Sequence, residues 1–179
     1  MPLPPRPDRH LFPTLPRRPI RVVLDGVTHL PNIGTMFRLC DAFRVEHLYV
    51  CGGAEVKPHQ RKLGKPAAGT IGWVPYSHVD DALTIVQQSK AEGYTVAVIE
   101  LCDDSIPPHE MTTDKPLCLV LGAERHGIQA SVLALADERV EIPTDGLGGS
   151  INITTAAAIV LYEAARRMPL PPLPPLPSS

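Results

Sequence analysis

The sequence contains no run of about 18 consecutive apolar residues, so no segment is expected to cross a membrane as a helix. Its first ten residues lack the apolar stretch of a signal peptide. The four cysteines are scattered without C-x-x-C spacing, and no pair of histidines has the spacing of metal ligands. These absences argue against a disulfide framework, a redox pair and a metal site, and they predict a reduced, cytoplasmic setting.

Two nucleotide-binding signatures are also missing. No lysine follows the glycines of residues 146–149 as in a phosphate-binding P-loop, and no G-x-G-x-x-G follows the first predicted strand. This weakens an interpretation as a nucleotide hydrolase or a nicotinamide-dependent dehydrogenase. The net charge of −2 excludes a globally basic protein, so a nucleic-acid partner would have to bind a local basic patch.

Proline is concentrated at the two ends of the 179-residue chain. Of the 21 prolines, seven precede Ile20 and six follow Met168. The hydrophobic share of 44% and the charged share of 20% are typical of a packed domain. We therefore predict a proline-rich arm over residues 1–19, one folded domain over residues 20–168, and a proline-rich tail over residues 169–179.

Within the domain, short apolar segments alternate with amphipathic ones. We predict buried strands at 20–24, 47–50, 94–99, 117–121 and 140–142, and an edge strand at 73–76. Helices are predicted at 31–43, 80–92, 129–137 and 151–167, with a polar loop over 54–70. Strands separated by helices indicate an α/β fold with a mainly parallel sheet and flanking helices. Ligands bind such sheets beyond the carboxyl ends of the strands.

The first candidate segment is the loop after the first strand, which leads into a helix start at Asn32. Helix N-termini bind anions and ligands, and Arg38 lies about two turns further along, off the apolar stripe. Both residues are candidates for a site. The simpler alternative is that Asn32 only begins the helix and Arg38 is a solvated charge.

Two further candidate segments are rich in glycine. The strand ending at Leu121 runs into a turn from Gly122 to Gly127 that carries Glu124, and its glycines let the backbone approach something closely. An ordinary strand-to-helix turn with a surface glutamate is the alternative. Residues 142–152 end at a helix start with Ser150 and Asn152, both common N-cap residues, so capping alone would explain one of them.

A local basic patch is present in the polar loop. It comprises Lys57, Arg61, Lys62 and Lys65, and a second cluster comprises Arg17, Arg18 and Arg21. Such residues make phosphate contacts to nucleic acid, although a solvated surface explains them equally well.

Together, these segments resemble the three motifs of the SpoU/TrmH family, which are S-adenosylmethionine-dependent RNA ribose 2′-O-methyltransferases of the SPOUT superfamily. The matching residues are Pro31-Asn32-Ile33-Gly34 with Arg38, Leu121-Gly122-Ala123-Glu124 with Gly127-Ile128, and Ile142-Pro143 with Ser150-Ile151-Asn152 and Ala156 to Glu163. They occur in the family's order and spacing between Ile20 and Arg166.

The resemblance implies a SPOUT fold whose C-terminal chain threads a loop in a deep trefoil knot, an exception to the rule that chains do not thread loops. It implies S-adenosylmethionine bound in the knot, with contacts to its adenine from Gly122, Ile142 and Ile151. It also implies a homodimer with the last helix, 151–167, in the interface.

By the same transfer, the catalytic site would comprise Asn32, Arg38, Glu124, Ser150 and Asn152. Arg38 is the residue proposed in the family to activate the ribose hydroxyl. Because arginine stays protonated in proteins, placement of the phosphate and the alkoxide by its charge is an equally good physical account. Glu124 and Asn152 would orient Arg38 or the methyl donor, and Ser150 would contact the target phosphate or ribose.

The expected activity is therefore ribose 2′-O-methylation of RNA. No separate RNA-binding domain precedes the catalytic one, which favours tRNA over ribosomal RNA as the substrate. The alternatives are the same reaction on ribosomal RNA, a non-catalytic RNA-binding module with the knot fold, and an ordinary doubly wound small-molecule enzyme. The arginines of the N-terminal arm predict that deletion of residues 1–16 weakens RNA binding.

Overall fold

The structure is a computed structural model that describes residues 15–57, 61–67, 69–147 and 150–170, without the side chains of residues 61, 62 and 64. The two predicted proline-rich ends fall largely outside these residues. In the described part of the chain, no helix has the length and apolar character needed to cross a bilayer.

The domain is built on six parallel strands in the order β3-β2-β1-β5-β4-β6, which confirms the predicted parallel α/β fold. The strands are β1 (Arg18–Asp25), β2 (Val45–Cys51), β3 (Tyr76–Val79), β4 (Thr95–Ile99), β5 (Leu117–Gly122) and β6 (Glu138–Val140). β1 is central, and six of its eight residues are buried. Because all strands run the same way, their carboxyl ends lie along one edge of the sheet.

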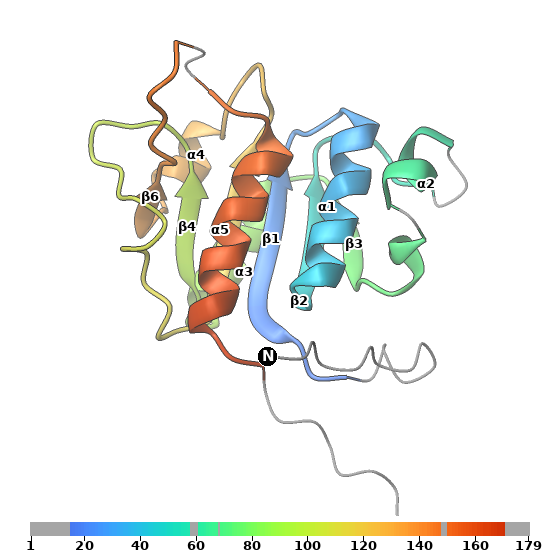
Figure 1. The fold of residues 1–179 in the computed structure, drawn as a ribbon, viewed down its shortest axis with the longest axis horizontal. Helices are drawn as coiled ribbons and strands as arrows, with labels where there is room; N and C mark the ends of the chain where they lie inside the picture. Colours follow the sequence, from blue (N-terminus) through green and yellow to red (C-terminus); the bar gives the residue numbers. More distant parts are fainter. Residues whose placement is uncertain (1–14, 58–60, 68, 148–149, 171–179) are drawn as a thin grey trace, which may run out of the picture.

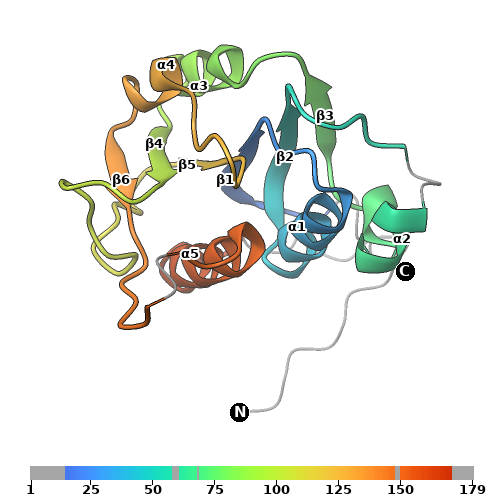
Figure 2. The same ribbon diagram turned by 90° about the horizontal axis from the view of Figure 1, so that it is seen from above.

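Helices cover both faces of the sheet (Figures 1 and 2). One face carries α1 (Leu30–Ala42), α2 (Arg61–Ala67) and α5 (Ile153–Arg167), and the other carries α3 (Ala82–Ala91) and α4 (Ala130–Leu133). Alternate residues of β1 face opposite sides, so that Leu24 packs in the cluster beneath α1 and α5, whereas Val23 packs in the cluster beneath α3. α1 and α5 both begin at the carboxyl edge of the sheet (Figure 1).

The predicted loop 54–70 contains a helix that sequence patterns do not indicate. α2 includes Gly64 and Pro66, which both disfavour helix, but its Leu63 and Ala67 are buried against α1. The contact depends on Gly34, where a Cβ would lie 2.7 Å from the carbonyl oxygen of Leu63. Gly34 therefore lets α2 dock on α1.

The edge strand lies three residues further along than predicted. Residues 70–72 form a 3-10 helix, η2 (Thr70–Gly72), and β3 starts at Tyr76, directly after Pro75. Proline has no amide hydrogen for a ladder, and Pro75 contributes only its carbonyl oxygen, which accepts from the Leu48 amide at 2.9 Å. The helix predicted at 129–137 is shorter in the structure, where it is α4. The strand predicted at 140–142 begins and ends two residues earlier, as β6.

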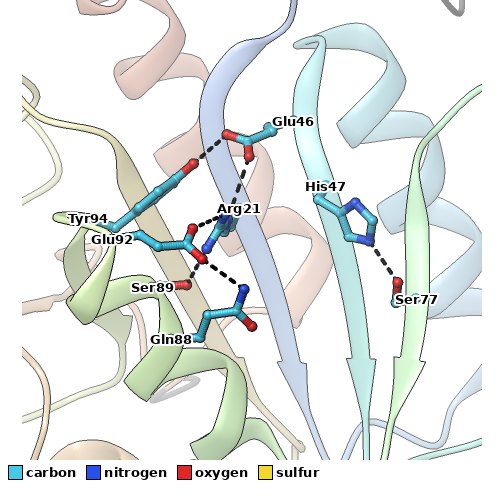
Figure 3. A network of polar contacts seen from close by, with 8 residues as sticks. All are labelled: Arg21, Glu46, His47, Ser77, Gln88, Ser89, Glu92 and Tyr94. Carbon is cyan, nitrogen blue, oxygen red and sulfur yellow. Dashed lines mark hydrogen bonds and ion pairs between the residues drawn. The ribbon is translucent and has the colours of Figure 1, made fainter.

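A buried arginine joins the sheet to α3 (Figure 3). Arg21 is 8% exposed, donates from Nη1 to Ser89 Oγ at 3.1 Å, and forms a 2.5 Å ion pair with Glu92. Its guanidinium stacks 4.1 Å from the ring centroid of Tyr94, whose hydroxyl donates to Glu46 at 2.7 Å. The prediction that Arg21 belongs to a surface cluster is therefore wrong, because its charge is enclosed by these partners.

Two more arginines close the edge of the sheet where the strands begin. Arg17 Nη2 donates to the Trp73 carbonyl oxygen at 2.6 Å. Arg18 Nε donates to the Met168 carbonyl oxygen at 2.8 Å and its Nη1 to that of Phe43 at 2.7 Å. Burial lowers the pKa of both guanidinium groups. Arg18 thus fastens the first strand to the end of the last helix.

Candidate active site

The first cavity, of about 270 Å³, opens at the carboxyl edge of the sheet. Its walls come from the segments that follow β4, β5 and β6 and from the start of α5. All three residues predicted to contact the adenine lie on these walls, namely Gly122, Ile142 and Ile151, together with Ser150. The structure thus brings together four predicted residues that are separated by up to a strand, a helix and a loop in the chain.

The charge on these walls has one sign. The carboxylates of Glu100, Glu124 and Glu141 line the first cavity, and no Lys, Arg or His is among its described lining residues. Glu141 is held in place because its carboxylate accepts from Ser105 Oγ at 2.6 Å. The cavity therefore favours a cationic ligand over a phosphate.

The close approach predicted for the glycines after β5 is made by the chain itself. A Cβ at Gly122 would lie 2.2 Å from the carbonyl carbon of Gly127, which is too close for two non-bonded atoms. Gly127 has a φ of +64°, which favours glycine, and its amide donates to the Ala123 carbonyl oxygen at 2.8 Å. The two glycines therefore close a tight turn that holds Glu124 at its tip.

Three of the predicted catalytic residues form one hydrogen-bonded network. Asn32 Nδ2 donates to Glu124 Oε1 at 2.9 Å, and Asn152 Nδ2 donates to the same oxygen at 3.2 Å. Asn152 Nδ2 also lies 3.4 Å from Asn32 Oδ1. The bonds join residues 92 and 28 positions apart in the chain. A carboxylate bonded to two amide groups is fixed in position and direction.

Each asparagine is positioned by a helix start. Asn152 is the N-cap of α5, and its Oδ1 accepts from the Thr154 amide at 2.8 Å. Asn32 lies in the first turn of α1, beside Pro31, and is only 8% exposed. Asn152 caps the helix with Oδ1 and joins the network with Nδ2, so its capping of α5 is compatible with a role in the site.

A second cavity of about 700 Å³ adjoins the first. Asn32 and Asn152 line it, and so do Thr28 and His29 before α1 and Arg125 and His126 after Glu124. Ala123, Glu124 and Ile153 line both cavities, and Glu124 is the one carboxylate that they share among the described residues. The arrangement can hold two ligands on opposite sides of Glu124.

Arg38 lies apart from this network. It is exposed on α1 and is on the wall of neither cavity within this chain. Ser150 is exposed beside the first cavity. Of the five predicted catalytic residues, the structure therefore joins three directly, places the fourth nearby, and places the fifth on a neighbouring surface.

The predicted basic residues lie in two different places. Lys57 and Lys65 are exposed, Lys57 pairs with Glu55 at 2.9 Å, and Arg61 and Lys62 begin α2, where their side chains are not described. Arg17 and Arg18 lie at the edge of the sheet where the strands begin, opposite the cavities, and are bonded to backbone carbonyls. Their guanidinium groups support the fold rather than an exposed patch.

Several residues on the cavity walls were not singled out from the sequence. They are Thr28, His29, Glu100, Arg125, His126 and Glu141. A signal did exist for five of them, because Thr28, His29, Glu100, Arg125 and His126 follow the carboxyl ends of predicted strands, where ligand sites form. Glu141 falls inside the predicted strand 140–142 and lies beyond a strand end only because β6 stops at Val140. Among the described residues, no group of three or more His, Cys, Asp or Glu is arranged to hold a metal ion.

Known proteins resemble this chain over most of its length. The model of the SpoU rRNA Methylase family matches residues 19–162. The tRNA (guanosine(18)-2′-O)-methyltransferase of Escherichia coli K12 is 31% identical over 153 residues, covering 84% of this chain and 65% of the relative's own length. This chain therefore spans just under two thirds of that relative.

Solved structures share the fold. The TrmH/SpoU tRNA modifying enzyme of A. aeolicus has a TM-score of 0.78 at 28% identity, over 89% of this chain and 81% of that one. The SpoU methyltransferase AviRb from Streptomyces viridochromogenes, in complex with the cofactor AdoMet, has a TM-score of 0.71 at 26% identity, over 91% and 65%. The family indicated by the three sequence motifs is confirmed: this chain belongs to the SpoU rRNA methylase family.

Proposed function

We propose that this protein transfers the methyl group of S-adenosylmethionine to a ribose 2′-hydroxyl of RNA. One observation carries the proposal: two adjoining cavities share Glu124, which the amides of Asn32 and Asn152 hold between them. Methyl transfer needs a donor and an acceptor aligned at one point, and it requires no metal.

The first cavity suits the donor. The sulfonium of S-adenosylmethionine is a cation, and the carboxylates of Glu100, Glu124 and Glu141 line the cavity, with no basic side chain among its described lining residues. We assign the adenine to the end formed by Gly122, Ile142 and Ile151, where backbone groups can bind it. The same charge disfavours the phosphates of a nucleotide or dinucleotide, which argues against a small-molecule enzyme of that kind.

The second cavity would hold the acceptor ribose. The hydroxyl oxygen forms a bond to the methyl carbon, the bond from that carbon to sulfur breaks, and the hydroxyl proton leaves. Glu124 is placed to accept this proton, because it is the carboxylate that faces both cavities. Arg38 cannot accept a proton readily, so we assign it the stabilisation of the developing alkoxide and the target phosphate. Ser150 would contact the target ribose or phosphate.

Arg38 can serve this role if two copies of the chain associate. The exposed face of α5 carries Ile159 and Tyr162, which are 40% and 61% exposed, and α1 packs beside α5. We propose a homodimer through this face, with Arg38 of each copy directed to the second cavity of the other. Tyr162→Asp should then give a monomer in light scattering that binds S-adenosylmethionine but does not methylate RNA. A dimeric or fully active variant would contradict this interface.

We propose tRNA as the substrate. As part of its binding surface we propose the exposed Lys57 and Lys65 together with the start of α2 at Arg61 and Lys62. The tRNA-modifying relatives support this choice, and ribosomal RNA is the alternative. Arg17 and Arg18 are left out of this surface because their guanidinium groups are bonded to backbone carbonyls.

None of the four cysteines is in a disulfide, which supports a cytoplasmic location.

We also propose the C-terminal trefoil knot. The loop that would be threaded is the segment between β4 and β5, which contacts both β6 and the end of α5. The Ile106 amide donates to the Arg139 carbonyl at 2.8 Å, and Arg167 Nη1 donates to the Met111 carbonyl at 2.7 Å. Pulling the chain from its ends should leave a tightened knot that shortens the unfolded length. A fully extended length would refute the knot.

The central test is transfer of labelled methyl from S-adenosylmethionine to unmodified tRNA and to ribosomal RNA fragments. We expect wild-type protein to label tRNA, and Glu124→Gln to bind the donor but lose most of the rate. Protein that binds the donor and labels no RNA would reduce this chain to a binding module. Nuclease digestion followed by mass spectrometry would identify the methylated nucleoside.

A further inference from the structure

The turn that carries Glu124 also presents the next two side chains to the second cavity. The amides of His126 and Gly127 donate to the Ala123 carbonyl oxygen at 3.3 and 2.8 Å, and Gly122 packs against Gly127 below them. Arg125 and His126 are exposed at the tip of this turn and line the second cavity. A turn closed in this way holds both side chains beside Glu124.

The second cavity differs from the first in its charged groups, because it sets Arg125 beside the shared Glu124, whereas the described charged residues of the first are carboxylates alone. Arg125 is the single Lys or Arg among the described lining residues of either cavity. Two imidazoles, from His29 and His126, line the same cavity, and His29 comes from the loop that leads into α1. Beside Glu124, the second cavity therefore offers a permanent cation and two imidazole rings that can hydrogen-bond a ligand.

We propose that Arg125 binds the RNA phosphodiester next to the methylated ribose, with His126 as a second contact to the same nucleotide. In RNA the 2′-hydroxyl and the 3′-phosphate are attached to neighbouring ribose carbons, so a hydroxyl held at Glu124 brings its phosphate into the second cavity. The planar guanidinium of arginine bonds two phosphate oxygens at once, which a lysine cannot do. This inference rests on the proposed function and deepens it by naming, beside the roles proposed for Arg38 and Ser150, a further group that positions the acceptor.

The pairing of charges explains how the two ligands are sorted. A cationic donor is drawn to the carboxylates on one side of Glu124, and an anionic phosphate to Arg125 on the other. Because Arg125 directly follows Glu124 in a closed turn, the phosphate and the reacting hydroxyl would be held in register.

The test compares Arg125→Ala, Arg125→Lys and His126→Ala with Lys115→Ala, which removes an exposed charge before β5, at the opposite edge of the sheet. For Arg125→Ala we expect the KM for RNA to rise about tenfold or more, since a charge-assisted contact is lost. The salt dependence of RNA binding should weaken by about 0.7–0.9 in its logarithmic slope, as for one phosphate contact. Arg125→Lys should recover the salt slope but only part of the KM.

Affinity for S-adenosylmethionine separates the possible outcomes. It should be unchanged in Arg125→Ala, and Lys115→Ala should match the wild type in every measurement. A wild type that methylates RNA together with an Arg125→Ala variant of unchanged KM and salt slope would overturn this inference alone. Loss of donor binding or of thermal stability in Arg125→Ala would also overturn it, since Arg125 would then act on the fold. A wild type that methylates no RNA would instead reject the proposed function.

Discussion

Replacing Arg21 with methionine should destabilise the domain while leaving the cavities intact. Methionine keeps an unbranched apolar side chain in the space between β1 and α3 but removes the guanidinium, which is 8% exposed. The loss includes the 3.1 Å bond to Ser89 and the stacking 4.1 Å from the Tyr94 ring centroid (Figure 3). It also leaves Glu46 without the nearby cation.

The magnitude follows from these contacts. A buried hydrogen bond from a charged donor contributes about 1.5–3 kcal/mol, and a cation–ring contact about 0.5–1 kcal/mol. Part is offset because the guanidinium no longer has to be desolvated. We therefore expect a loss of about 2–3 kcal/mol, which for a domain of this size lowers Tm by roughly 4–12 °C.

The assay is thermal and urea unfolding of wild type and variant, with Arg166→Met as a matched control. Arg166 is an exposed arginine on α5 that pairs with Glu163, and its loss should barely change Tm. The pKa of Glu92 lies below its usual value because Gln88 and Arg21 donate to its carboxylate. The contribution of this ionised carboxylate is present above the ordinary pKa of about 4.3 and is lost as pH falls through the lowered one. The difference in Tm between the two proteins should therefore narrow in acid without disappearing, because the contacts of Arg21 with Ser89 and Tyr94 do not titrate there.

An Arg21→Met variant with the stability of the wild type would refute the reasoning, since it would mean that desolvation cancels every contact in the network. Reduced affinity for S-adenosylmethionine at a temperature where the variant is fully folded would refute the separation of this network from the cavities.

Three further predictions follow from single contacts. Gly34→Ala should lower stability by about 1–3 kcal/mol in urea unfolding despite the better helix propensity of alanine, because its Cβ would overlap the Leu63 carbonyl oxygen at 2.7 Å; a stabilised variant would show that α2 can move aside. Glu100→Gln should weaken binding of S-adenosylmethionine in calorimetry more than binding of the product S-adenosylhomocysteine, which lacks the sulfonium charge. Equal losses of affinity would show that Glu100 does not act through its charge on the sulfonium. Burial opposes ionisation of Asp137, but bonds from Lys90 and the Val96 amide hold its pKa below the ordinary value. Asp137→Asn should therefore be less stable than the wild type near pH 7, with the difference disappearing as pH falls below about 4, and a difference that persists in acid would assign the effect to packing.

The sequence indicates the central strands and the three-residue network because their signals are local. β4 and β5 are nearly continuous apolar segments, and the apolar core of β1 is interrupted only by Arg21. Asn32 and Asn152 stand at helix starts that their own neighbours predict. The family motifs then select Glu124 from the other surface glutamates. All these signals lie within a few residues of the position that they describe.

The misplaced elements depend on partners that are distant in the chain. α2 forms in spite of Gly64 and Pro66 because Gly34, about 30 positions earlier, leaves room for it. Arg17, Arg18 and Arg21 look alike in a sequence, yet each is bonded to groups that folding brings next to it. The charge of a side chain can be read from a sequence, whereas its exposure depends on which carbonyls and carboxylates surround it.

The bond from Arg18 to the Met168 carbonyl brings the two ends of the folded domain together at the edge opposite the cavities. A short linker could therefore join residues 17 and 169, and the chain could be reopened between β4 and β5. Such a circular permutant would keep the same sheet and the same cavities. The segment between β4 and β5, which we propose to be the loop that the C-terminal chain threads, would however be cut open, so the chain would have no knot. Its folding rate and stability, set against those of the natural order, would measure what the knot itself contributes.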